Sequence, residues 1–173
     1  VSAIAALTFF IPMLHTHQMS VALLPLALLG ATLGFLPRNF HPARIFIGSS
    51  GAYFLGYTVG ALALIGGARA ATALLVMGVP ILDVAWQILH RLRHGRSPGA
   101  GDRGHLHFRL VDLGLPQRRI VLLYYVLSLV LGGLALLLPS PRFKLIALVG
   151  LGVVVAGVLA FLTRLGERAT EAE

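Results

Sequence analysis

Long apolar stretches alternate with short polar connections along the whole chain. Six apolar spans lie at roughly Ser2–Leu14, Val21–Leu36, Gly51–Gly66, Ala70–Leu89, Ile120–Leu138 and Leu145–Leu165. A helix that crosses a bilayer needs about 20 apolar residues, or about 17 at the short end, so the first span is short for that purpose. The pattern predicts an all-α, polytopic integral membrane protein with about six transmembrane helices. Residues 1–173 then form a single transmembrane domain.

The composition also indicates that the chain is surrounded by lipid. Hydrophobic residues make up 57% of the chain and charged residues only 12%. Soluble domains average about 25% charged residues, so this chain lacks the polar surface that water requires. There is no cysteine, which excludes disulfides and thiolate metal sites.

The net charge of +8 is of the kind found in nucleic-acid-binding proteins. We discount a nucleic-acid partner because half of the Lys and Arg residues fall in one connection between apolar spans. If the spans alternate in direction, most basic residues lie on one side of the membrane. They are Arg38, Arg44, Arg91, Arg93, Arg96, Arg103, Arg109, Arg118, Arg119, Arg164 and Arg168. The positive-inside rule predicts that this side, with both ends of the chain, is cytoplasmic.

The fourth connection, residues 90–118, is a long basic loop. It joins flexible glycines to several Arg residues and to His105 and His107. Arginine offers a bidentate fork to phosphate oxygens. The two histidines share a face only if the segment is extended, and there they could hold a phosphate or a metal. The alternative is a solvated loop that sets topology and touches lipid headgroups.

The second connection contains Asn39 and Arg44 and ends in Gly48-Ser49-Ser50-Gly51. Either serine is a natural N-cap for the helix that follows. The exposed N–H groups of such a helix start can also receive an anion. The cap interpretation alone is sufficient, because this tetrapeptide is weak as a motif.

Asp83 lies inside the fourth apolar span. A carboxylate within a membrane span indicates a functional site, but it can equally be a structural partner for an Arg or a backbone group. The many small residues, such as the pairs Gly30/Gly34 and Gly56/Gly60, predict close helix packing.

Together the two loops resemble a known family. The signature runs from Gly34 to Gly56, continues in Pro80-Ile81-Leu82-Asp83 and Arg96-Ser97-Pro98, and ends in Asp102-Arg103-Gly104-His105-Leu106-His107-Phe108-Arg109-Leu110. This order is similar to the polyprenyl-phosphate N-acetylhexosamine-1-phosphate transferases of glycosyltransferase family 4. The resemblance is strongest to the bacterial branch that transfers N-acetylglucosamine 1-phosphate to undecaprenyl phosphate in cell-wall or surface-polysaccharide synthesis.

The resemblance implies a Mg²⁺-dependent transfer of a sugar 1-phosphate from a UDP-sugar to polyprenyl phosphate in the bacterial plasma membrane. The phosphate-binding candidates it suggests are Asn39, Arg44, Arg103, His105, His107 and Arg109. Mg²⁺ prefers carboxylate and phosphate oxygens.

Two departures bear on that activity. Ser49 stands where the family has its metal-associated Asp, and Phe108 replaces the third histidine of a His-x-His-His motif. The family's upstream Asp-Asp pair and its Asn- and Asp-rich loop do not occur in the chain. We therefore expect the chain to correspond to the C-terminal half of the family fold, and we assign neither a catalytic residue nor a metal ligand.

Three hypotheses remain at this point. The chain is part of a family enzyme, or it is a non-catalytic descendant that binds polyprenyl phosphate or a partner subunit, or it belongs to a transporter. The transporter hypothesis ranks last because Asp83 is almost alone as a charge deep in a span. The sequence leaves the oligomeric state open, with a homo-oligomer as one candidate assembly.

Overall fold

The computed structural model describes residues 1–17, 19–65, 70–93, 95, 105–138 and 140–170. These ranges contain eight helices and no strand. In chain order the helices are α1 (Ser2–His15), α2 (Met19–Asn39), α3 (Gly48–Ile65), α4 (Ala70–Val76), α5 (Gly78–Arg93), α6 (Leu106–Asp112), α7 (Gln117–Leu137) and α8 (Pro141–Thr170). The prediction of an all-α fold is confirmed.

Four of the described helices are long and apolar enough to cross a membrane. They are α2, α3, α7 and the Pro141–Val158 part of α8. Together, α4 and α5 qualify as a fifth span, although they are bent by 78° at the break between them. The first helix, α1, is apolar but has only 14 residues. The chain is therefore a polytopic membrane protein, and all six predicted apolar spans are helical.

The break between α4 and α5 falls where the sequence weakens a helix. Pro80 has no N–H to donate to the carbonyl of Val76, and its ring would clash with that carbonyl in a continuous helix. Accordingly, α4 ends at Val76. Gly78 lets α8 approach the bend, because a Cβ there would lie 2.9 Å from Cδ2 of Leu151. The predicted span Ala70–Leu89 is thus two helices rather than one straight helix.

The core of the bundle lies mainly between α1, α4 and α7. The side chains of Phe9, Met13, Leu75 and Val76 are fully buried there. Close contact between α1 and α7 depends on Gly132, where a Cβ would lie only 2.8 Å from the Thr8 hydroxyl oxygen. Small residues at a helix interface allow this approach in lipid.

The other predicted glycine contacts do not form among the described residues. A Cβ added at any of four glycines would meet nothing within 4 Å. These are Gly30, Gly34, Gly56 and Gly60. The prediction of packing through these pairs is therefore wrong for the described contacts, because the helices meet through other faces.

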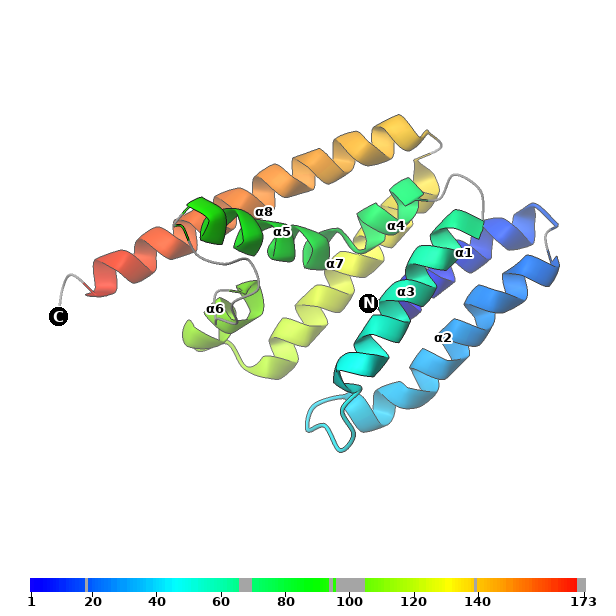
Figure 1. The fold of residues 1–173 in the computed structure, drawn as a ribbon, viewed down its shortest axis with the longest axis horizontal. Coiled ribbons are helices and arrows are strands. Elements are labelled where there is room, and N and C mark those ends of the chain that lie inside the picture. Colours follow the sequence, from blue (N-terminus) through cyan, green and yellow to red (C-terminus); the bar gives the residue numbers. More distant parts are fainter. Residues whose placement is uncertain (18, 66–69, 94, 96–104, 139, 171–173) are drawn as a thin grey trace.

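Polar connections gather at one end of the bundle (Figure 1). There α2 ends, α3 begins, and α6 lies beside the start of α7. We call this end, formed by residues 38–47 and 105–119, the basic end, because it carries Arg38, Arg44, Arg109, Arg118 and Arg119. Away from it, α5 and α8 run side by side and lean away from α1, α2 and α3.

Candidate functional site

Asp83 of α5 joins two residues at the start of α6. Its Oδ2 atom lies 3.0 Å from Nδ1 of His105, and its Oδ1 atom accepts a hydrogen bond of 2.8 Å from the N–H of Leu106. The Asp83 residue is only 5% exposed. Both carboxylate oxygens therefore have partners, and the buried charge is satisfied as its position inside a membrane span requires.

His105 and His107 come together at the junction of loop and helix. Their ring centroids lie 5.8 Å apart and the rings are nearly parallel, at 20°. The ring of His107 also lies 4.1 Å from that of Phe108. The two rings therefore lie side by side although the segment is not extended, because His107 belongs to α6 and His105 immediately precedes it.

The pKa of His107 is lowered from its ordinary value of 6.5. Partial burial is the largest cause, because it disfavours the charged ring. The Asp83 carboxylate acts in the opposite direction and raises the pKa, whereas His105 lowers it. The net result favours a neutral His107 imidazole at pH 7.

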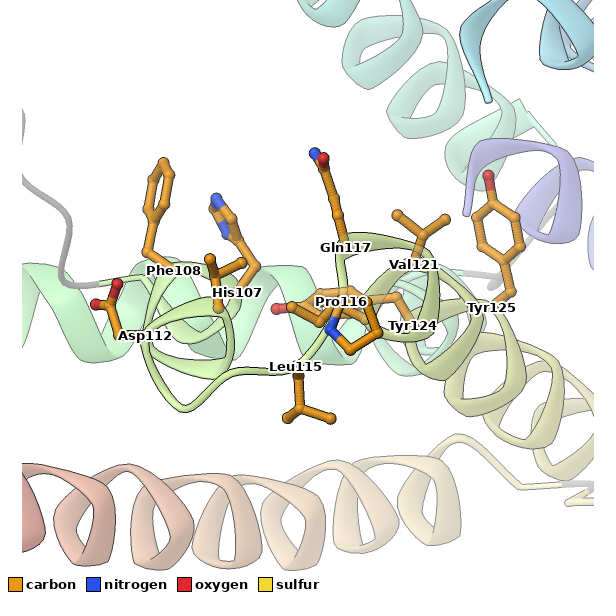
Figure 2. Close-up of a pocket in the computed structure, with 11 residues that line it drawn as sticks. His107, Phe108, Asp112, Leu115, Pro116, Gln117, Val121, Tyr124 and Tyr125 are labelled. Carbon is orange, nitrogen blue, oxygen red and sulfur yellow. The ribbon is translucent and has the colours of Figure 1, made fainter. Parts of the chain in front are cut away.

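A cavity of about 820 Å³ lies beside this histidine pair. Figure 2 shows His107, Phe108, Gln117 and Tyr125 projecting to the same side, away from α8 and toward the side on which α3 lies. The wall along α7 is largely apolar and includes Ile120, Val121 and Tyr124. The cavity therefore combines an imidazole and an amide with an extended apolar wall.

A second, more apolar cavity of about 290 Å³ lies among α1, α2, α3 and α7. Asn39 and Ile47 line it from the second connection, and Tyr125 lines it from α7. Tyr125 also lines the larger cavity. The cavities lined by the two connections that carry the sequence signature therefore share Tyr125.

The second connection is closed by its own hydrogen bonds. Asn39 Nδ2 donates to the carbonyl of Ile45 at 3.1 Å, and the N–H groups of Arg44 and Ile45 both donate to the carbonyl of Arg38. This use of Asn39 shows a loop-closing role for a residue predicted to bind phosphate. The Arg44 side chain is exposed.

The serines of the second connection do not cap α3. The helix begins at Gly48, where φ is +65°, so Ser49 and Ser50 lie inside its first turn. Glycine adopts this left-handed conformation at no steric cost, so Gly48 can stand at the start of α3 in place of a capping serine. Both serines are exposed at the basic end.

Two predicted phosphate-binding side chains lie outside the described structure. Arg103 falls in residues 96–104, and of Arg109 only the backbone in α6 is described.

Sequence reasoning missed Gln117, Tyr124 and Tyr125. The available signal was a pair of tyrosines near the start of an apolar span, where amphipathic rings gather at the membrane interface. Tyr124 carries a buried hydroxyl with no hydrogen-bond partner among the described residues. Tyrosine hydroxyls usually have a partner when buried.

The described residues do not fit a Mg²⁺ site. Within the parts of the chain that the structure describes, no three His, Cys, Asp or Glu side chains come together. Both oxygens of Asp83 already accept hydrogen bonds, and Ser49 offers only a neutral hydroxyl. Mg²⁺ usually takes one or two carboxylates, which this set of described side chains does not supply.

Comparison with known proteins agrees with this organisation. The model of the family described as Glycosyl transferase family 4 matches residues 1–67. No solved structure matches the chain.

Three curated relatives illustrate the likeness. A probable undecaprenyl-phosphate N-acetylglucosaminyl 1-phosphate transferase of Bacillus subtilis is 34% identical over 80% of this chain and 40% of its own length. A decaprenyl-phosphate N-acetylglucosaminephosphotransferase of Mycolicibacterium smegmatis is 40% identical over 73% of this chain and 36% of its own length. A phospho-N-acetylmuramoyl-pentapeptide-transferase of Moorella thermoacetica is 36% identical over 76% of this chain and 42% of its own length.

The chain thus spans about two fifths of the length of these relatives. The matched region nevertheless includes most of the chain, and the family model covers the second connection with its flanking helices. The helical bundle, the two signature loops and these matches lead to one assignment. The chain belongs to glycosyl transferase family 4, and it resembles the polyprenyl-phosphate N-acetylglucosamine-1-phosphate transferases in that family.

Proposed function

We propose that the chain forms part of an enzyme that transfers N-acetylglucosamine 1-phosphate from its UDP donor to a polyprenyl phosphate. The observation that supports this most strongly is the position of Tyr125. It lines the cavity of His107 and also the cavity of Asn39 and Ile47, so two distant parts of the family signature line cavities that share this residue.

In the proposed reaction, an oxygen of the lipid phosphate attacks the phosphorus that carries the sugar. The bond from this phosphorus to the oxygen that bridges to the uridine phosphate breaks. UMP leaves with the electron pair of that bond, and the product is a polyprenyl diphosphate sugar. No oxidant or other co-reactant is needed, because one phosphoanhydride is exchanged for another.

Both substrates are anionic, so their approach must overcome charge repulsion. The basic end presents exposed arginines that can offset this charge, namely Arg38, Arg44, Arg118 and Arg119. The ring of His107 lines the larger cavity and can form a hydrogen bond with a phosphate oxygen. The apolar wall along α7 offers a surface for the first isoprene units of the lipid.

The proposal places Mg²⁺ on carboxylates outside the described residues. When bound, the ion would neutralise the diphosphate of the donor. Ser49 and the two occupied oxygens of Asp83 argue against a complete metal site within the described part of this chain.

Ser49 also favours a second candidate function. A chain that lacks the family's carboxylate at this position can still bind polyprenyl phosphate without transferring sugar phosphate to it. Such a non-catalytic protein would use the arginines and the apolar wall in the same way.

The test is transfer of radiolabelled N-acetylglucosamine 1-phosphate to undecaprenyl phosphate in membranes. The chain is expressed alone and together with the N-terminal half of the Bacillus subtilis relative. Labelled lipid in the complemented sample alone would establish an enzyme part in which Ser49 is tolerated. Product that appears only with Ser49→Asp would support the non-catalytic descendant, whereas product from the chain alone would overturn the need for upstream carboxylates.

We propose further that the basic end faces the cytoplasm of a bacterial plasma membrane, with both ends of the chain on that side. Because the chain contains no cysteine, single introduced thiols report topology without background. Ser50→Cys lies at the basic end, and Thr16→Cys lies just after α1 at the other end. A membrane-impermeant maleimide should label Thr16→Cys in intact cells and Ser50→Cys only after permeabilisation; the reverse result would invert the topology.

A further inference from the structure

The helix α5 turns its polar side chains inward. Asp83, Gln87 and Arg91 are spaced four residues apart and are all buried. Ile81, Val84, Ile88, Leu89 and Leu92 are exposed on its other faces. This arrangement is the reverse of an amphipathic helix in water and suits a helix whose outer face meets lipid. Asp83 is therefore directed into the protein, where it meets the start of α6.

The two bonds of Asp83 restrict His105 in two ways. The bond to the Leu106 N–H fixes the backbone next to the histidine, and the bond to Nδ1 fixes the ring. Because a carboxylate accepts hydrogen bonds, this contact favours a His105 ring that carries its hydrogen on Nδ1. In the neutral ring, Nε2 is then the nitrogen with a free lone pair.

The ring of His105 in turn contacts the cavity through its neighbour. It stacks on His107, and His107 lines the larger cavity. A continuous series of contacts thus runs from the buried carboxylate to the ring that faces the substrate space. Partners of this kind set the tautomer and orientation of a histidine without touching the substrate.

We infer that Asp83 is a positioning residue that acts through His105, holding it as the Nδ1–H tautomer and aligning the His105–His107 pair with the cavity. Its effect on catalysis rests on the proposed function; its effect on the tautomer does not. A purely structural role would instead require only that Asp83 anchor the start of α6.

The variant Asp83→Asn separates these roles. The asparagine oxygen can still accept from the Leu106 N–H, so the anchor is kept. Its NH₂ group can only donate, and this favours a His105 ring whose Nδ1 is unprotonated and whose Nε2 carries the hydrogen. The matched control for the tautomer measurement is Asp112→Asn, which removes a carboxylate from the other end of α6; because Asp112 also lines the larger cavity, it does not serve as a control for activity.

The direct measurement is ¹⁵N NMR of the histidine-labelled chain in lipid nanodiscs, with His105 assigned by its loss in His105→Asn. We expect an Nδ1–H signal for the native protein and for Asp112→Asn, and an Nε2–H signal for Asp83→Asn. An unchanged His105 tautomer in folded Asp83→Asn would overturn the inference. This result does not depend on any transferase activity, so it is distinct from failure of the proposed function.

The kinetic measurement uses Asp83→Asn and Asp83→Glu in the complemented membranes. We expect Asp83→Asn to lower kcat roughly 10- to 100-fold with little change in the KM for the UDP donor, as loss of an outer-shell partner commonly does. Asp83→Glu, which keeps a carboxylate, should recover part of this loss. Suppose that Asp83→Asn lowers kcat, that Asp83→Glu does not restore it, and that the His105 tautomer is unchanged. Asp83 would then only anchor the start of α6, and the inference would be wrong.

If Asp83→Asn does not fold, His105→Asn answers the same question. Its amide NH₂ can still donate to Asp83, so the anchor remains while the imidazole ring of His105 is lost. A folded His105→Asn variant with native thermal stability and kcat lowered at least tenfold supports the inference. Native kcat in this variant would overturn it.

Discussion

The Nδ1 atom of His105 lies 3.0 Å from the Oδ2 atom of Asp83, although 22 residues separate them in the chain. The contact joins the membrane-embedded helix α5 to the short helix α6 at the basic end. It gives the only strongly buried carboxylate described in the structure a defined partner. It also links α5 to the larger cavity, because His105 stacks on His107, which lines that cavity.

The lowered pKa of His107 predicts a pH effect on stability. Because the folded-state pKa lies below the unfolded value of 6.5, the unfolded chain binds more protons between the two values. The free energy of unfolding should therefore fall as pH drops from about 6.5 through the folded-state pKa. Thermal unfolding between pH 5 and pH 8 should show this slope, and His107→Gln should reduce it.

Removal of the Asp83 carboxylate should also change the protonation equilibrium of His107. The carboxylate raises the pKa of His107, so Asp83→Asn should lower that pKa further. An NMR titration of His107 measures the shift directly. A rise in the His107 pKa of this variant would contradict the assigned electrostatics.

Pro80 is expected to maintain the bend between α4 and α5. In Pro80→Ala, residue 80 regains an N–H that can bond to the Val76 carbonyl, which favours a straighter helix. Spin labels at Leu74→Cys and Ile88→Cys report the change, since both sites are exposed and the chain has no other thiol. Their separation should increase toward the ~21 Å that 14 residues span in a straight helix.

An unchanged distance in Pro80→Ala would show that tertiary contacts alone hold the bend. Ile81→Ala, one residue further along the same helix, is the matched control and should leave the distance unchanged.

Gly132 and Gly133 form a matched pair of neighbours for testing the contact between α1 and α7. A Cβ at Gly132 would lie 2.8 Å from the Thr8 hydroxyl, which is itself bonded to the Ile4 carbonyl at 2.8 Å. Overpacking of this kind costs about 1–3 kcal/mol. Gly132→Ala should therefore be destabilised in reversible denaturant unfolding.

The control Gly133→Ala should be close to neutral, because a Cβ there meets nothing within 4 Å. Equal destabilisation of the two variants would indicate a general loss of backbone flexibility rather than a clash with Thr8.

Gly114 should be required for the turn from α6 into α7. It has φ of +83°, and the N–H groups of Gly114 and Leu115 bond back to the carbonyls of Val111 and Leu110. This is the Schellman arrangement that ends a helix with a left-handed residue. Gly114→Ala should cost about 1–2 kcal/mol of folding free energy because of its added Cβ. Gly150→Ala in α8, where the space is open, should change stability by less than about 0.5 kcal/mol.

The membrane fold was largely predictable from the sequence, and particular elements show why. The apolar spans match helices because length and hydropathy are local properties. The break before Gly78 carried a local signal in Pro80, but the apolar run continues across it and resembles one span of the right length. The glycine pairs in α2 and α3 were misread because spacing alone does not reveal which helix lies opposite.

The candidate site was only partly predictable. His105, His107 and Asp83 stood out as polar residues in unusual places, and the family signature grouped them. Their mutual contacts depend on how α6 folds back onto α5, which no local pattern encodes. Tyr125 was missed for the same reason: its importance comes from two cavities that meet beside it, and each cavity has walls from distant parts of the chain.

The inward-facing polar residues of α5 also bear on how the protein is inserted during synthesis. A helix that carries Asp83, Gln87 and Arg91 partitions poorly into lipid by itself, since a charged residue at the centre of a span costs about 2.5–3.5 kcal/mol on the insertion scale. Its stabilising partners at His105 and Leu106 are made later by the ribosome. We therefore expect α5 to settle at its final depth only after α6 and α7 have emerged, so that maturation of the site is a late event in biogenesis.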